Sequence, residues 1–132
     1  MDKESGHLAI RLGLYWTYTF PAGTYDNYSL ADISGYDDSF DVILDRQAIQ
    51  HNTIENIEKT INEVKRVLRK GGSFFSTMIS EADYDIDTTY ITEKAARKLL
   101  SDFKIISIDK HRSTYDNQKK KHSLLIIHVL KI

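Results

Sequence analysis

The chain has 132 residues and a mass of 15.3 kDa, a length suited to one domain that can bury a core of its own. Its formal net charge of -1 gives no overall attraction to nucleic acid or to an anionic membrane. The absence of cysteine excludes disulfides, thiolate metal sites and a cysteine nucleophile. No apolar run approaches the roughly 18–20 residues that span a bilayer, so we expect a single cytoplasmic domain over residues 1–132.

Residues 1–39 are expected to form an N-terminal segment with one strand. Residues 7–14 alternate like a strand but also fit the last turns of a helix, and this length does not decide between the two. Residues 15–20, YWTYTF, carry aromatic and β-branched side chains and are predicted to form a strand. Residues 22–39 are rich in Gly, Asn, Asp and Ser and are predicted to form a loop.

Residues 40–80 predict a strand, a helix and a second strand. The run FDVIL at residues 40–44 is short and apolar, as is typical of a buried strand. Asn52 is expected to cap the helix, with Glu55 three residues later completing a capping box. The apolar face of the helix is expected to consist of Ile54, Ile57, Ile61, Val64 and Leu68.

The end of this helix carries its own signals. Arg69 and Lys70 are predicted to lie where positive charge suits the helix dipole, and Gly71-Gly72 to supply a left-handed exit. Residues 73–79 then predict a second buried strand. Two strands joined through a helix form a right-handed crossover, so we expect them to be parallel.

Residues 92–132 predict a helix and the closing strands. Thr92 is expected to cap a helix over residues 92–103, and strands are expected at residues 105–109 and 123–132. The connection between these strands is polar and contains no helix. We therefore expect them to pair antiparallel or to lie two places apart.

Two stretches, DDSFDVILDRQAIQHN and EVKRVLRKGGSFFSTMI, resemble the second half of the class I S-adenosylmethionine-dependent methyltransferases. That family has a strand of the form "sFDvv" and a helix ending "RvLkpGG" in the same order. The resemblance implies an α/β fold: an incomplete Rossmann-like methyltransferase sheet with parallel crossover units and an antiparallel final strand. Residues 7–26 are similar to the helix, turn and third strand of that fold. The implied activity is methyl transfer from S-adenosylmethionine, with S-adenosylhomocysteine as product, to an acceptor that the sequence does not identify.

The resemblance also implies site residues. Asp45, Arg46 and Gln47 follow the first strand of the central unit and would line the methionine portion of the cofactor. The alternative is that they solvate the strand end. His51 falls where the family often has a histidine and is the candidate catalytic base, with local packing as its alternative.

Gly23 and Asp26 are the nearest match to the loop that contacts the adenine of the cofactor. An Asx turn would explain Asp26 equally well. A metal site is not expected, because the histidines show no metal-ligand spacing and no HExxH motif occurs. Lys119, Lys120 and Lys121 lack interleaved aromatics, which favours a solvated hairpin tip over a nucleic-acid site.

The cofactor loop of the family is missing from this sequence. The glycines stand at positions 6, 13, 23, 35, 71 and 72, and no G-x-G pattern occurs. The first two strands of the parent fold also have no counterpart, which predicts a gap beside residues 40–44. Either residues 1–36 rearrange, or a homodimer or partner chain fills the gap, or the chain is a shorter version of a longer enzyme. A non-catalytic binding or dimerisation module is the alternative function.

Overall fold

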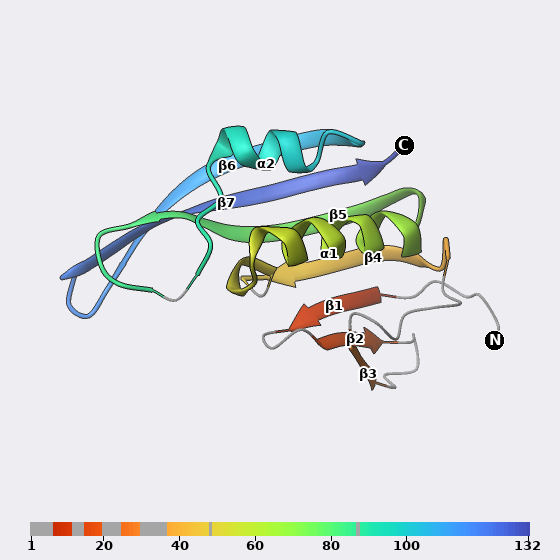
Figure 1. Cartoon of the computed structure of the whole chain (residues 1–132), viewed down its shortest axis with the longest axis horizontal. Helices are drawn as coiled ribbons and strands as arrows, with labels where there is room; N and C mark the ends of the chain where they lie inside the picture. Colours follow the sequence, from red (N-terminus) through yellow and green to blue (C-terminus); the bar gives the residue numbers. More distant parts are fainter. Residues whose placement is uncertain (1–6, 12–14, 20–24, 30–36, 48, 87) are drawn as a thin grey trace.

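The computed structural model describes residues 7–11, 15–19, 25–29, 37–47, 49–86 and 88–132. In these residues seven strands form one sheet with the order β3-β2-β1-β4-β5-β7-β6 (Figure 1). The strands are β1 (His7–Arg11), β2 (Tyr15–Thr19), β3 (Tyr25–Ser29), β4 (Phe40–Arg46), β5 (Leu68–Ala82), β6 (Phe103–Tyr115) and β7 (Lys120–Lys131). The helices are the 3-10 turn η1 (Ile49–His51), α1 (Ile54–Val67) and α2 (Glu93–Leu99). No helix in these ranges is both long and apolar enough to cross a membrane.

The central strand, helix and strand are confirmed, and β4 and β5 are parallel, with Ile43 opposite Phe74. The predicted cap is wrong by one residue. Thr53 is the N-cap of α1, and its hydroxyl accepts a hydrogen bond from the amide of Asn56 at 3.3 Å. The side-chain amide of Asn52 instead donates to the carbonyl of Ile49 at 3.0 Å.

The helix also ends earlier than predicted. It stops at Val67, so Arg69 and Lys70 lie beyond it and the basic residues of its last turn are Lys65 and Arg66. The left-handed backbone expected at Gly71 is confirmed by a φ of 76°. Leu68 pairs with Phe40 and Ser73 with Val42, so the residues between Leu68 and Ser73 form an irregularity in the ladder. A side chain at Gly72 would meet the carbonyl oxygen of Arg69 at 2.8 Å.

The C-terminal part follows the predicted order with different lengths. Thr92 caps α2, and its hydroxyl accepts from the amide of Ala95 at 3.1 Å. The helix ends at Leu99 and Phe103 begins β6, where the sequence predicted a helix through Phe103. β6 and β7 pair antiparallel as adjacent strands, and β7 also pairs antiparallel with β5.

The N-terminal strands differ most from expectation. β1 and β2 are both strands, so the helix that the resemblance implied in this region is wrong. β3 lies inside the predicted loop and pairs antiparallel with β2. β1 pairs parallel with β4, from His7 opposite Val42 to Ile10 opposite Asp45. The chain therefore fills the expected gap with its own residues, as the first of the three hypotheses proposed. Unsatisfied edge hydrogen bonds of β4 give the physical reason for this pairing.

The two faces of the sheet differ in how they are covered. Figure 1 shows α1 across β4 and β5 and α2 near β6 and β7, on the same side of the sheet. Beneath them lies a core of fully buried side chains that includes Ile43, Phe74, Met78, Ile127 and Val129. On the other side, which we call the open face, Leu44, Phe75 and Ile126 are 46%, 39% and 44% exposed.

Candidate functional site

The candidate site begins at the carboxyl end of β4, where parallel sheets usually bind their ligands. Asp45 is 3% exposed, and its side chain lies on the core side of the sheet. One carboxylate oxygen, Oδ1, accepts from the amide of Ile49 at 3.2 Å, and the other, Oδ2, accepts from the Ser76 hydroxyl at 2.6 Å. Asp45 thus ties the end of β4 to η1 and to β5. These bonds satisfy a buried charge that would otherwise be costly.

Arg46 and Gln47 lie next to this buried carboxylate. Arg46 is exposed and makes no ion pair with any described residue. Gln47 has a left-handed backbone with a φ of 55°, and its amide donates to the carbonyl of Thr77 at 3.1 Å. Thr77 stands opposite Arg46 in the ladder, and its hydroxyl is buried without a hydrogen-bond partner among the described residues. Among the described residues, an unsatisfied hydroxyl and a cation without an ion pair therefore stand opposite each other at this edge.

Gln50 joins three segments next to the same edge, and sequence reasoning missed it. It is 2% exposed, and its side-chain oxygen accepts from the amide of Ile79. Its backbone carbonyl accepts from the amide of Thr89 at 2.8 Å and from the hydroxyl of Thr88 at 3.1 Å. Nothing in the local sequence marks Gln50, because these partners lie 29 or more residues away.

The loop of residues 83–92 is consequently held at both ends. Near η1, the Thr89 hydroxyl also donates to the carbonyl of Asn52 at 2.6 Å. At the other end, the Asp83 carboxylate accepts from the amide of Lys121 at 2.8 Å. The Tyr84 hydroxyl lies 3.1 Å from Nδ1 of His122. The loop is thus anchored between η1 and the start of β7, and it begins after Ala82, where β5 ends.

Glu81 lies near this loop, and the pKa of its carboxyl group is lowered. Its carboxylate is 3.2 Å from Nζ of Lys110 and accepts from the Ser123 hydroxyl at 3.1 Å. The hydrogen bond from Lys110, followed by the one from Ser123, holds the pKa of Glu81 below its ordinary value of 4.5. The Glu81 carboxylate is therefore negatively charged at neutral pH and is bound by Lys110 and Ser123.

The remaining predicted residues lie at different distances from the edge. His51 is exposed at the end of η1, five residues beyond Arg46 in the sequence. Asp26 is in β3, which β2 and β1 separate from β4. Gly23 falls outside the described residues. Asp45, Arg46 and Gln47 thus stand together at the end of β4, and the structure does not bring Asp26 to them.

The residues at the edge fit S-adenosylmethionine only in part. The free guanidinium of Arg46 suits a carboxylate such as that of an amino-acid moiety, and the Thr77 hydroxyl needs a partner. The Asp45 carboxylate is 3% exposed and accepts from Ile49 and Ser76, so it is not presented to ribose hydroxyls. Gly71 and Gly72 lie at the opposite end of β5 and cannot approach a ligand here. Within the described ranges no three His, Asp or Glu side chains gather as metal ligands would.

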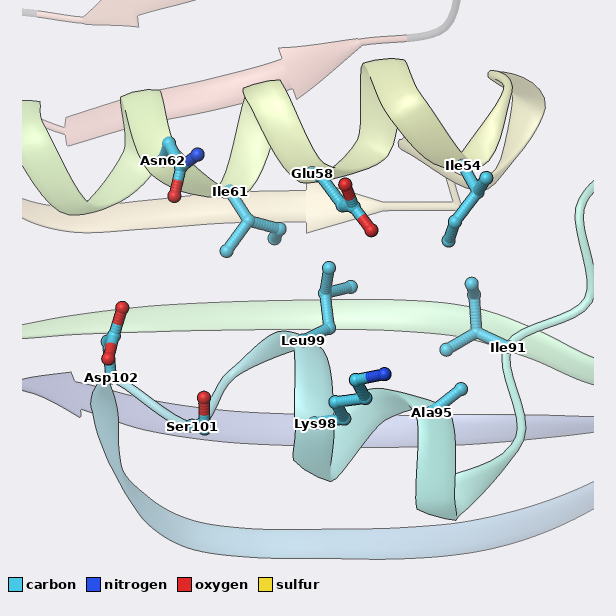
Figure 2. Close-up of a pocket in the computed structure, with 10 residues that line it drawn as sticks. All are labelled: Ile54, Glu58, Ile61, Asn62, Ile91, Ala95, Lys98, Leu99, Ser101 and Asp102. Atoms are coloured by element: carbon cyan, nitrogen blue, oxygen red, sulfur yellow. The ribbon is translucent and has the colours of Figure 1, made fainter.

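A cavity lies away from this edge. Figure 2 shows it between α1 and α2, with a volume of about 460 Å³. Ile54, Ile61, Ile91 and Leu99 contribute its apolar lining. The carboxyl edge of β4 and this groove between α1 and α2 are therefore separate features.

A sheet with a parallel strand, helix and strand at its centre, and polar side chains at the carboxyl ends of those strands, defines a Rossmann-like α/β protein. The sequence model of a methyltransferase domain matches residues 17–124. The chain belongs to this methyltransferase family. No curated protein matches it significantly.

Solved structures show the same fold. A candidate methyltransferase from Bacillus halodurans superposes with a TM-score of 0.64 at 13% identity, over 78% of this chain and 69% of that one. An S-adenosylmethionine-dependent methyltransferase from Methanosarcina mazei gives 0.64 at 17% identity, over 79% and 65%. A phosphoethanolamine N-methyltransferase from Haemonchus contortus, solved with phosphomonomethylethanolamine and S-adenosylhomocysteine, gives 0.59 at 12% identity, over 81% and 37%. The matched region thus spans between 37% and 69% of the length of these proteins.

Proposed function

We propose that this chain takes part in methyl transfer from S-adenosylmethionine to an acceptor nucleophile. The observation that carries the proposal is the match of a methyltransferase domain to residues 17–124. The parallel unit of β4, α1 and β5, with its polar carboxyl edge, supports it. When bound, S-adenosylmethionine supplies a methyl group on a positively charged sulfur, which an aligned nucleophile can accept.

Arg46 and Gln47 are proposed to hold the methionine portion of the cofactor. The guanidinium of Arg46 is exposed and unpaired among the described residues, so it can bind a carboxylate without first breaking an ion pair. Asp45 acts as a positioning residue, because its bonds to Ile49 and Ser76 fix the backbone that presents Arg46. His51 is proposed as a base for the acceptor.

Completion of the site is part of the proposal. At the carboxyl edge of β4, the described residues provide neither a glycine-rich loop nor an acid exposed for ribose hydroxyls. We therefore propose that further N-terminal elements or a second chain supply them. Neighbouring structures are longer than the region that matches this chain, which is consistent with such additional elements.

Titration calorimetry with S-adenosylhomocysteine tests the cofactor part of the proposal. We expect measurable binding and, for Arg46→Gln, a dissociation constant raised about tenfold through the loss of a charge-assisted hydrogen bond. Arg112→Gln is the matched control, because Arg112 is also an exposed strand arginine without an ion pair among the described residues. His51→Gln should leave this affinity within about twofold, since a base for the acceptor need not touch the cofactor.

A non-catalytic binding module is the second candidate. The internal commitment of the Asp45 carboxylate and the absence of a G-x-G pattern favour it. The same titration separates the two functions. If neither S-adenosylmethionine nor S-adenosylhomocysteine gives heat at high micromolar protein, methyl transfer by this chain alone is excluded and the binding module remains.

A further inference from the structure

The groove between α1 and α2 has an apolar floor that is open to solvent. In Figure 2, Ile61 of α1 and Leu99 of α2 point toward each other, and so do Ile54 and Ile91. Ile61 and Ile91 are buried at 3% and 1% exposure. Ile54 stands at the mouth of the groove and is 47% exposed, which is unfavourable for a large apolar side chain in water.

The two walls of the groove carry opposite charges. Glu58 projects from α1 and Lys98 from α2, facing each other across the floor (Figure 2). Both are exposed, and neither forms an ion pair with a described residue. The third charged lining residue, Asp102, already has Lys65 at 3.6 Å. One wall therefore offers an unmatched negative charge and the other an unmatched positive charge.

We propose that a second copy of this chain docks on the groove to form a two-fold homodimer. A two-fold axis along the groove places α1 of each copy over α2 of the other. Glu58 of each copy then meets Lys98 of the second copy, which gives two reciprocal ion pairs around the apolar floor. The half-exposed Ile54 of each copy becomes covered. Such a contact uses the same surface on both copies and closes as a dimer.

The charge pattern is the reason for choosing a second copy as the occupant. An acidic wall and a basic wall on either side of one apolar floor are complementary to the same surface after a two-fold rotation. Among the described residues, Leu44, Phe75 and Ile126 expose apolar surface on the open face, but none of these side chains carries a charge that would identify an occupant. The dimer also leaves the carboxyl edge of β4 outside the contact, because the groove lining does not include Asp45 or Arg46.

Sedimentation velocity of the full chain between about 5 and 200 µM tests the proposal. We expect the mass to rise with concentration toward twice the 15.3 kDa of the chain. Glu58→Lys and Lys98→Glu should each raise the dimer dissociation constant about tenfold or more, because each places like charges in contact twice. The double variant carrying both changes should return to within about threefold of the original constant, since the pairs re-form with exchanged signs. Lys94→Glu, also on α2 but outside the groove lining, is the matched control and should have no effect.

Three results would overturn the proposal. The chain could remain monomeric over the whole concentration range. The double variant could fail to regain the original dimer dissociation constant, although circular dichroism shows that it is folded. Ile126→Lys could abolish the dimer while Glu58→Lys leaves it intact, which would place the contact on the open face.

Discussion

Phe74 and Phe75 are adjacent in β5, and their surroundings show how different the two faces of the sheet are. Phe74 is fully buried beneath the helices, with its ring centroid 6.5 Å from that of Phe103. Phe75 is 39% exposed on the open face and stacks on His128 at 4.1 Å. The strands β4, β5 and β7 have apolar residues at consecutive positions, a pattern typical of sheets covered on both faces. In this sheet, the described helices cover only one of the two faces.

Truncating the two phenylalanines should give the largest contrast. Phe74→Ala is expected to lower the free energy of unfolding by about 3–5 kcal/mol, because it leaves a cavity in the core. Phe75→Ala should lower the free energy of unfolding by about 1 kcal/mol, mostly through the loss of stacking on His128. Denaturant unfolding of both variants at low micromolar concentration measures the difference. Equal losses would mean that the open face is covered in solution.

The end of β4 gives the next contrast. Asp45→Ala should lower the free energy of unfolding by about 1–3 kcal/mol, because the Ile49 amide and the Ser76 hydroxyl lose their buried acceptor. Arg46→Ala, one residue along, should change stability by less than about 0.5 kcal/mol, since its side chain is exposed. The same unfolding measurement applies. A large loss for Arg46→Ala would show that its charge stabilises the fold and would weaken its assignment to ligand binding.

A charged side chain introduced on the open face should change the free energy of unfolding only slightly. Ile126 is 44% exposed, so Ile126→Lys is expected to change the free energy of unfolding by less than about 1 kcal/mol. It should also reduce the fluorescence of a dye that binds exposed apolar surface. Ile127→Lys, directed into the core at 1% exposure, is the opposite case and should unfold the protein. A destabilising Ile126→Lys would contradict the exposure of this face.

The smallest effect is expected at Glu81, an exposed residue whose carboxylate is 3.2 Å from Nζ of Lys110. Its pKa is lowered in the folded chain, so the stabilisation is present above the ordinary value of 4.5 and is lost as the pH falls through the lower folded value. Nuclear magnetic resonance of the Glu81 carboxyl carbon should show a midpoint below 4.5. Lys110→Gln should move that midpoint upward, whereas Lys104→Gln on the same strand should not.

Much of the central fold could be predicted because its signals are local. On the predicted apolar face of α1, Ile57, Ile61 and Val64 are buried, and Gly71 is left-handed as predicted. The assignment of Ile54 and Leu68 to that face is wrong, because Ile54 is 47% exposed and Leu68 belongs to β5. The cap was misplaced because Asn52 and Thr53 are adjacent and both are good caps, and in the structure it is Thr53 that accepts from the amide of Asn56. β3 was missed because its sequence, YDNYS, contains turn-forming residues, and pairing with β2 overrides that preference.

The candidate site could be predicted in part for the same reason. Asp45, Arg46 and Gln47 could be proposed because they stand at the end of an apolar strand, and their role stays a prediction. The commitment of Asp45 to Ser76, 31 residues away, could not be predicted, since the sequence does not say which side chains meet across the sheet. The same holds for Gln50, whose partners come from β5 and the loop that follows it.

The pairing of β1 with β4 has a consequence for local opening of the structure. In the described part of the sheet, the four pairs from His7 opposite Val42 to Ile10 opposite Asp45 are the only ladder that joins β1, β2 and β3 to the other strands. Breaking this short ladder would release all three strands together and leave the core beneath α1 and α2 intact. Their amide hydrogens should therefore exchange with solvent at one shared rate, faster than those of β5 and β7, as a separate cooperative unit.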